Sequence, residues 1–201
     1  MIALPQSLDF TDTRMNRDVC TFYMKILAVK NSDIHLHSQQ VANYAASIAA
    51  KIGLPAHEVA QIRTAALLHD IGKLAVPNVI LAKVPFLTTR ENAIYKRHAI
   101  AGASMLENLP GFEAVALMIR CHHEKWDGTG YPRRLKGQNI PIGARIIAVA
   151  NYYDQYLNPC TNRWQKTHAD AVVELQDKSG LDFDPAIVKA FIDSVLPQGA
   201  K

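Results

Sequence analysis

Cysteines and long apolar runs are both scarce in the chain, and each scarcity excludes a class of protein. The 201 residues include three cysteines, an odd number, and none lies in a Cys-x-x-Cys pair, so a disulfide-stabilised secreted fold is not expected. The N-terminus MIALPQSLDF lacks the basic and apolar segments of a signal peptide. No segment approaches the roughly 20 apolar residues that span a membrane. We therefore expect a soluble protein of the reducing cytoplasm with no membrane partner.

An excess of charge of one sign is also lacking. The 22 basic and 18 acidic residues leave a net charge of +4, and hydrophobic residues make up 49% of the chain. This balance suits a ligand that carries phosphate, but it is too mild to indicate binding of long nucleic acid. The apolar content is sufficient for one packed domain.

Apolar residues recur at helical spacing almost throughout the chain, and no stretch alternates as a strand would. Gly53 and the Leu-Pro-Gly of residues 109–111 interrupt the pattern, whereas Thr88 and Glu91 form a capping box at the start of a helix. The predicted helices cover residues 14–29, an apolar row over 41–52, a segment between Pro55 and His69, residues 89–107, 112–123, 142–157, and a last segment opened by Asp184 and Pro185. The sequence therefore predicts an all-α fold.

An apolar helix runs directly into polar side chains in LLHDIGKLAVP, residues 67–77. A buried charge without partners is costly, so His69 and Asp70 need a surface, polar partners or a metal. Further histidines lie at or next to apolar rows and are expected to face inward: His37, His98, His122 and His123. The gaps between them are about one helix and a loop long, so the imidazoles would converge from different helices, as they do in the metal sites of helical bundles.

A single inward histidine is more often a core residue hydrogen-bonded to a carbonyl, and that alternative stays open for His37 or His98 taken alone. His-Asp followed by Gly-Lys, and His-His-Glu directly before a glycine-rich loop, favour a metal. Imidazole together with carboxylate suits iron, manganese, zinc or nickel rather than calcium. In contrast, His35, His57 and His168 are predicted to lie at the surface.

Asp70 and Lys73 are the candidate catalytic residues. Asp70 would bridge two metals about 3.5–4 Å apart, an arrangement common in phosphoester hydrolysis, where a bridging hydroxide attacks phosphorus in line with the leaving oxygen. Lys73 would stabilise the charge that develops on a phosphate oxygen. The alternative for Lys73 is that it only meets the negative end of a helix dipole.

These residues resemble the HD superfamily of metal-dependent phosphohydrolases, and HHEKWDGTGYP at residues 122–132 is similar to the signature of its HD-GYP family. HSQQVANYAA, ALLHDIGKLAVP, FLTTRE with His98, and IPIGARIIAVA follow the other segments of that signature in order. The resemblance implies an HD-GYP domain over residues 33–201, with an N-terminal helical extension over residues 1–32. It implies an HD-domain helical bundle with two or three divalent metal ions, iron or manganese above all.

Individual roles carry over from the resemblance by position. Asp33 lies one helical turn before His37, where some members place a carboxylate for a third metal. Tyr131 would contact a guanine or a phosphate of the substrate, although the DGTGYP segment also suits a simple turn. The implied metal ligands are His37, His69, Asp70, His98, His122 and His123, with residue 151 as a further position.

The chain departs from the family at several positions. Asn151 stands where the family has an aspartate ligand, and although its carbonyl oxygen can coordinate, it carries no charge, so the metal would be held more weakly. Asp154 is predicted to support the metal ligands without binding the metal itself. The family has two basic residues that contact the phosphates of its ligand. The first of these positions is Cys160 in this chain, and Arg163 matches the second. KVPF replaces the usual Pro-Gly after the His-Asp helix.

The resemblance implies an enzyme that hydrolyses cyclic di-GMP to the linear dinucleotide and/or GMP. Asn151 and Cys160 motivate an alternative, a catalytically impaired module that binds a cyclic dinucleotide or a partner protein in signalling. An enzyme acting on another nucleotide or phosphomonoester is a third alternative, against which the Gly-Tyr-Pro loop argues. A diguanylate cyclase or another signalling protein is expected as a partner from the resemblance alone.

Overall fold

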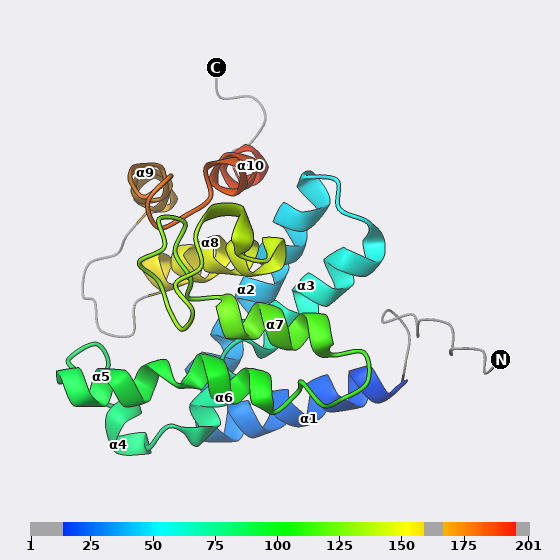
Figure 1. The fold of residues 1–201 in the computed structure, drawn as a ribbon, viewed down its shortest axis with the longest axis vertical. Helices are drawn as coiled ribbons and strands as arrows, with labels where there is room; N and C mark the ends of the chain where they lie inside the picture. Colours follow the sequence, from blue (N-terminus) through cyan, green and yellow to red (C-terminus); the bar gives the residue numbers. More distant parts are fainter. Residues whose placement is uncertain (1–13, 159–166, 196–201) are drawn as a thin grey trace.

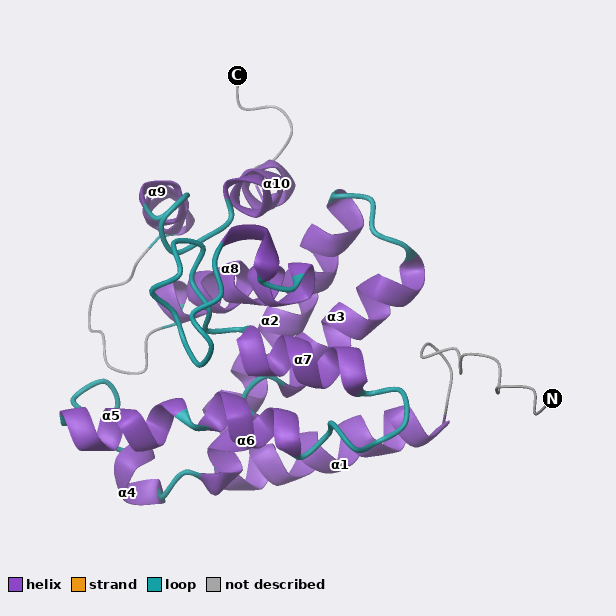
Figure 2. Cartoon of the chain, viewed as in Figure 1, coloured by secondary structure: helices purple, strands orange, loops and turns teal. Residues whose placement is uncertain are grey.

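The computed structural model describes residues 14–158 and 167–195, and within these ranges the chain forms helices and loops without a strand (Figure 1, Figure 2). The α-helices are α1 (Arg14–Lys30), α2 (Ser32–Lys51), α3 (Ala56–Leu68), α4 (Asn78–Leu81), α5 (Thr89–Lys96), α6 (His98–Ser104), α7 (Glu113–Cys121), α8 (Ile142–Leu157), α9 (His168–Asp177) and α10 (Pro185–Val195). Two short 3-10 helices, η1 (Ile71–Ala75) and η2 (Gly137–Asn139), lie in the connections. The all-α prediction is confirmed.

Several helices begin and end where their residues favour it. Asn31 caps α2, because its side-chain oxygen accepts hydrogen bonds from two backbone N–H groups of the first turn. The capping box of Thr88 and Glu91 is confirmed, since both of its hydrogen bonds are present at the start of α5. Gly53 follows the end of α2 with a φ of +79°, a conformation that glycine adopts without steric cost.

The helix predicted over residues 89–107 is wrong in its extent, because the chain forms two helices there. α5 ends at Lys96, α6 begins at His98, and Arg97 lies between them. The His98 ring donates to the carbonyl oxygen of Tyr95 at 2.8 Å, so a side chain uses a backbone acceptor at the break. α4 and α9 are further helices that the apolar spacing did not predict.

α2 is the central helix of the bundle and packs against α1, α3, α8 and α10 (Figure 1). These five helices and α7 supply much of the apolar core. Each fully buried apolar side chain stabilises the fold by about 1.5–3 kcal/mol through its removal from water. Fully buried examples are Leu27, Ile48, Ile62, Ile119 and Ile146. This core fixes the relative positions of α2, α3, α7 and α8, whose residues and ends include most of the predicted metal ligands.

η1 and α6 approach each other so closely that only glycine fits between them. A Cβ atom on Gly72 would lie 1.9 Å from the backbone oxygen of His98 and 2.5 Å from the nitrogen of Gly102. Backbone contact of this kind requires the absence of a side chain. It brings Asp70, which precedes η1, next to His98, the first residue of α6.

α1 packs against α2, α3 and η1. Its residues Met24 and Leu27 are buried, whereas Phe22 and Val29 are exposed. The domain boundary predicted between residues 32 and 33 lies near the junction of α1 and α2 and stays a prediction. None of the described helices has the length and apolar character for crossing a lipid bilayer.

Candidate metal centre

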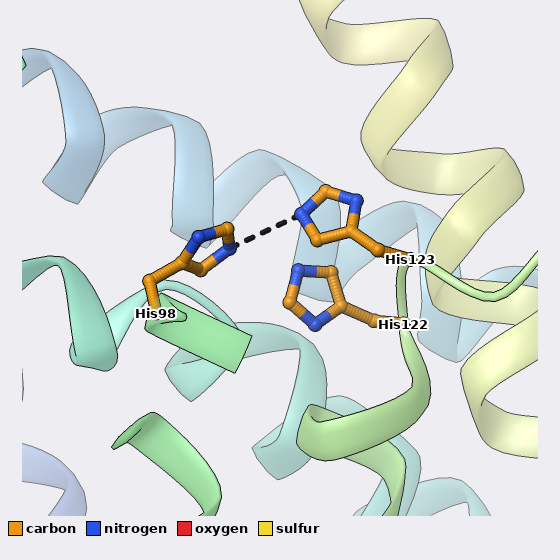
Figure 3. Close-up of side chains that lie close together, drawn as sticks. All are labelled: His98, His122 and His123. Atoms are coloured by element: carbon orange, nitrogen blue, oxygen red, sulfur yellow. Dashed lines mark hydrogen bonds between the residues drawn. The ribbon is translucent and has the colours of Figure 1, made fainter. Parts of the chain in front are cut away.

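Six side chains from separate parts of the bundle gather into two adjoining groups. The ligand atoms within each group all lie within 4.8 Å of one another. One, the His37 group, consists of His37, His69 and Asp70. The other, the three-histidine group, consists of His98, His122 and His123, and Figure 3 shows His98 facing the other two rings from the opposite side.

Asp70 lies between the two groups. Its Oδ2 atom is 3.4 Å from Nε2 of His69, and its Oδ1 atom is 3.6 Å from Nε2 of His98. One carboxylate oxygen therefore faces each group. This is the arrangement that the sequence analysis expected of a carboxylate bridging two metals.

Three of the imidazoles are oriented by the backbone that immediately precedes them. Each donates Nδ1–H to the carbonyl oxygen three residues earlier, which leaves Nε2 without a proton in the neutral ring. The bonds are His69 to Ala66 (2.7 Å), His98 to Tyr95 (2.8 Å) and His122 to Ile119 (2.6 Å). Fixing the tautomer through Nδ1 is how proteins prepare Nε2 to bind a metal.

The Nε2 atoms of His69 and His122 are buried and have no hydrogen-bond partner among the described residues. A buried acceptor without a partner costs about 1–3 kcal/mol. Nε2 of His98 lies 3.1 Å from Nε2 of His123, so two ring nitrogens also face each other (Figure 3). One of these two rings donates to the other. Cations would replace that hydrogen bond and satisfy the two unpartnered nitrogens, so the donor set of this centre fits divalent metal ions.

Burial keeps the three-histidine group neutral. It lowers the pKa of His98 to about 4. Burial, reinforced by the neighbouring imidazoles, holds the pKa values of His122 and His123 well below their usual range. Neutral imidazole is the form that binds metals.

Lys73 is paired with Asp70, since its Nζ atom lies 2.6 Å from Oδ2. Burial alone would raise the pKa of Asp70, but Lys73 and His69 outweigh it and hold that pKa well below its usual range. Burial would lower the pKa of Lys73, but Asp70 raises it. The pair is therefore charged, and the ammonium group neutralises the carboxylate between the two groups. The catalytic role of Lys73 stays a prediction.

His37 is held by side chains of α8. Its Nδ1 atom lies 2.6 Å from Oδ2 of Asp154, and its Nε2 atom lies 2.9 Å from Oδ1 of Asn151. Because a carboxylate accepts, Nδ1 carries the proton and Nε2 turns toward the site. Asn151 thus lies where a further ligand of the His37 group would be, and Asp154 lies behind the ring.

A family model described as HD domain matches residues 21–187 of the chain. The chain belongs to the HD domain family. A cyclic di-GMP phosphodiesterase of Thermotoga maritima is 36% identical to this HD domain over 165 residues, which are 81% of this chain and 45% of the relative. A 3'3'-cGAMP-specific phosphodiesterase of Vibrio cholerae is 35% identical over 165 residues, 78% of this chain and 30% of the relative. The chain therefore spans less than half the length of these curated relatives.

Solved structures share the fold of this HD domain at low sequence identity. An HDG"Y"P protein of Bdellovibrio bacteriovorus has a TM-score of 0.65 at 22% identity, over 89% of this chain and 60% of that chain. The Listeria monocytogenes PgpH HD domain in complex with cyclic-di-AMP has a TM-score of 0.63 at 18% identity, over 86% of this chain and 92% of that chain. The HD-domain bundle and the resemblance to the HD-GYP family are confirmed by the family match and these relatives.

The Gly-Tyr-Pro loop of the HD domain folds against the three-histidine group. The Tyr131 ring stacks on the His123 ring at 4.7 Å, and its backbone N–H donates to His123 O at 3.1 Å. Glu124 accepts from the backbone N–H of Arg133 and of Leu135 at 2.6 and 3.0 Å. Burial raises the pKa of Tyr131, so its hydroxyl stays protonated and can donate. The loop is a turn anchored by Glu124, and it places Tyr131 beside the three-histidine group.

Other predicted residues lie apart from the two groups. Asp33 is exposed in the first turn of α2 and belongs to neither group, while Cys160 and Arg163 lie outside the described residues. His57 and His168 are exposed, as predicted. The surface prediction for His35 is wrong, because α1 packs over it: the ring is half-buried, with Nδ1 3.0 Å from Met24 O.

Besides Glu124, the residues Gln155 and Lys96 lie at the site and had no predicted role. Gln155 donates from Nε2 to Oδ1 of Asn151 at 2.9 Å, and the spacing of four residues on one helix was the signal that could have found it. Lys96 places its Nζ atom 5.0 Å from the centre of the Tyr131 ring. Its position two residues before His98 was the corresponding signal.

A hollow of about 450 Å³ lies elsewhere, between α1, α2 and α3. Lys25, His35 and Arg63 are among its lining residues, and no member of the two ligand groups is. The candidate metal centre of this HD domain is therefore recognised by its converging ligand atoms and not by a concave surface.

Proposed function

We propose that this HD domain is a metal-dependent phosphodiesterase that hydrolyses cyclic di-GMP, or a closely related cyclic dinucleotide, to the linear dinucleotide and/or GMP. The observation that carries the proposal is the pair of ligand groups with Asp70 between them. The names of the relatives support the substrate class, since they include phosphodiesterases of cyclic di-GMP and of 3'3'-cGAMP.

The His37 group with Asn151 would hold one ion, and the three-histidine group would hold the other, with Asp70 shared. Iron or manganese suits this mixture of imidazole and oxygen ligands, and a third ion would use Asp33. Bound there, such ions would lower the pKa of a water molecule, and their positive charge would stabilise the scissile phosphate. The Nδ1 hydrogen bonds of His69, His98 and His122 hold these three rings in place and leave their Nε2 atoms to bind metal.

The surrounding residues would bind and orient the substrate. Tyr131 offers a protonated hydroxyl beside the three-histidine group. Lys73 offers a buried ammonium for a phosphate oxygen while it neutralises Asp70. Arg163 is the remaining basic residue proposed to contact a phosphate.

The cellular setting is also a proposal. The thiols of Cys20 and Cys121 are free in the part of the chain described, which suits a reducing cytoplasm. Regulation by a diguanylate cyclase or another signalling protein stays a prediction.

The direct test is hydrolysis by the purified chain. Apoprotein is loaded with Mn²⁺, or with Fe²⁺ under anaerobic conditions, and incubated with cyclic di-GMP while products are separated by chromatography. We expect the linear dinucleotide or GMP to accumulate, and we expect an Asp70→Asn variant to form it about a thousandfold more slowly. Failure of the loaded chain, alongside turnover by the Thermotoga maritima relative in the same assay, would contradict the proposal.

Asn151 favours one second candidate, an impaired domain that binds a cyclic dinucleotide without turnover. The neutral oxygen 2.9 Å from His37 Nε2 replaces an anion, so the ion at the His37 group is held with one negative charge fewer. The Asn151→Asp variant separates the two candidates. If only that variant hydrolyses cyclic di-GMP while both chains bind it, the natural chain is a binding module.

A further inference from the structure

Asn151 presents its Oδ1 atom to Nε2 of His37 in an arrangement that suits two ligands of one cation. Nδ1 of His37 donates to Asp154 at 2.6 Å, so in the neutral ring Nε2 is an acceptor. Oδ1 of Asn151 is also an acceptor, and it lies 2.9 Å from that nitrogen. A neutral ring therefore gains no hydrogen bond from this oxygen, and either a cation bound by both atoms or a proton on Nε2 would link them. Neighbouring ligands of one octahedral ion, each about 2.1 Å from the metal, are separated by about 3 Å.

An asparagine amide can also turn the other way. Turned by half a rotation, Asn151 would present its NH₂ group to His37 and form an ordinary hydrogen bond with Nε2. That orientation has no oxygen for a metal, because the amide nitrogen is a donor. An aspartate has no such alternative, since its two oxygens are equivalent. Asn151 therefore needs something that selects the orientation in which its oxygen faces His37.

Gln155 supplies that selection. Its Nε2 atom donates to Oδ1 of Asn151 at 2.9 Å, from one turn further along α8. The carbonyl oxygen has two lone pairs, so one accepts from Gln155 while the other points toward His37. Turning Asn151 around would bring two NH₂ groups face to face, which both residues would have to avoid together.

We propose that Gln155 is a positioning residue that holds the Asn151 amide with its oxygen toward the metal of the His37 group. The inference rests on the proposed metal centre, but it does not require turnover. It makes Asn151 and Gln155 a functional pair, in which the second residue makes the first a dependable neutral ligand. Gln155 itself is exposed and acts through Asn151.

The test is a double-mutant cycle on metal binding. Gln155→Met keeps the length of the side chain and removes its donor, and it is made in the natural chain and in an Asn151→Asp background. Mn²⁺ binding to chelator-stripped protein is measured by calorimetry, with free Mn²⁺ followed by paramagnetic resonance. Gln176→Met, at an exposed position of α9, is the matched control for the substitution itself.

We expect Gln155→Met to weaken one of two Mn²⁺ sites about tenfold in the natural chain and to change it less than about twofold in the Asn151→Asp background. Gln176→Met should leave both sites unchanged. Unchanged binding in Gln155→Met, or an equal loss in both backgrounds, would overturn the proposal. A chain that shows the expected cycle yet hydrolyses no cyclic dinucleotide would uphold this inference and contradict the proposed function.

Discussion

The two ligand groups differ at His37, whose ring is held by side chains, whereas its group neighbour His69 is fixed by a backbone carbonyl. In the three-histidine group, His98 and His122 are fully buried and each is fixed by the backbone carbonyl three residues earlier. In the His37 group, the ring of His37 is half-buried and is held by the side chains of Asp154 and Asn151. Backbone acceptors cannot be substituted, whereas side chains can. Variation in metal affinity is therefore expected at the His37 group first.

Removing the residue that joins the groups should have the largest effect. Asp70→Asn withdraws the shared carboxylate, and we expect loss of both tightly bound ions and about a thousandfold loss of hydrolysis, equivalent to several kcal/mol. Metal content by mass spectrometry and product formation measure this. Because the substitution also leaves Lys73 buried without its partner, at a cost of about 3 kcal/mol, Asp70→Asn/Lys73→Met is made in parallel. Two ions retained per chain in both variants would contradict the bridging position.

The contact that brings the groups together should be nearly as sensitive. Gly72→Ala would place a Cβ atom 1.9 Å from His98 O, and backbone cannot yield as a side chain would. We expect a loss of about 3 kcal/mol in the free energy of unfolding and separation of Asp70 from His98. Gly102→Ala, on the α6 side of the same contact, is the milder comparison, because its Cβ would lie 3.1 Å from Gly72 N instead of at clash distance; it should change stability by less than about 1 kcal/mol. Equal stability of both variants in urea would contradict this reading of the η1–α6 contact.

The same contact explains how far sequence reasoning could reach. The convergence of histidines was predictable because each lies at a helix end or on an apolar row, and α8 (Ile142–Leu157) matches the helix predicted over residues 142–157. Which imidazoles share a group was not predictable, since it depends on the approach of η1 to α6. Gly72 gives no periodic signal of that approach.

Polar contacts between side chains were the other part beyond reach. Periodicity placed residues 89–107 in one helix, but the break at Arg97 accompanies a hydrogen bond from a side chain to the backbone at Tyr95. Likewise, Asn151 was recognised as a departure from the family, whereas its partner Gln155 was not. Such bonds depend on rotamers and amide orientation, which one sequence does not encode in its spacing.

Acid should destabilise the metal-free chain chiefly through the three-histidine group. Burial lowers the pKa of folded His98 from 6.5 to about 4, so below pH 6.5 the unfolded chain binds more protons. Stability should fall as the pH drops from 6.5 toward 4, by about 1.4 kcal/mol per pH unit for His98. His122 and His123, whose pKa values are also lowered, add to the loss.

Urea unfolding of protein freed of metal with a chelator, between about pH 5 and pH 8 in steps of about half a unit, measures how stability depends on pH. His98→Asn should flatten the dependence, whereas the exposed His57→Asn should not change it. Equal stability at the two ends of that interval would contradict the burial of neutral imidazoles.

The smallest effect is expected where a single side-chain acceptor is removed from the His37 group. Asp154→Ala frees Nδ1 of His37, so we expect about tenfold weaker binding of one Mn²⁺ ion while the ion of the three-histidine group is unaffected. Asp154→Asn retains an oxygen acceptor and should recover much of the loss. Asn158→Ala removes only the 3.2 Å hydrogen bond from Asn158 to Asp154 and serves as the control. If Asp154→Ala weakens both ions equally, the two groups are not held independently. The contrast between backbone-fixed and side-chain-fixed imidazoles would then have no consequence for metal binding.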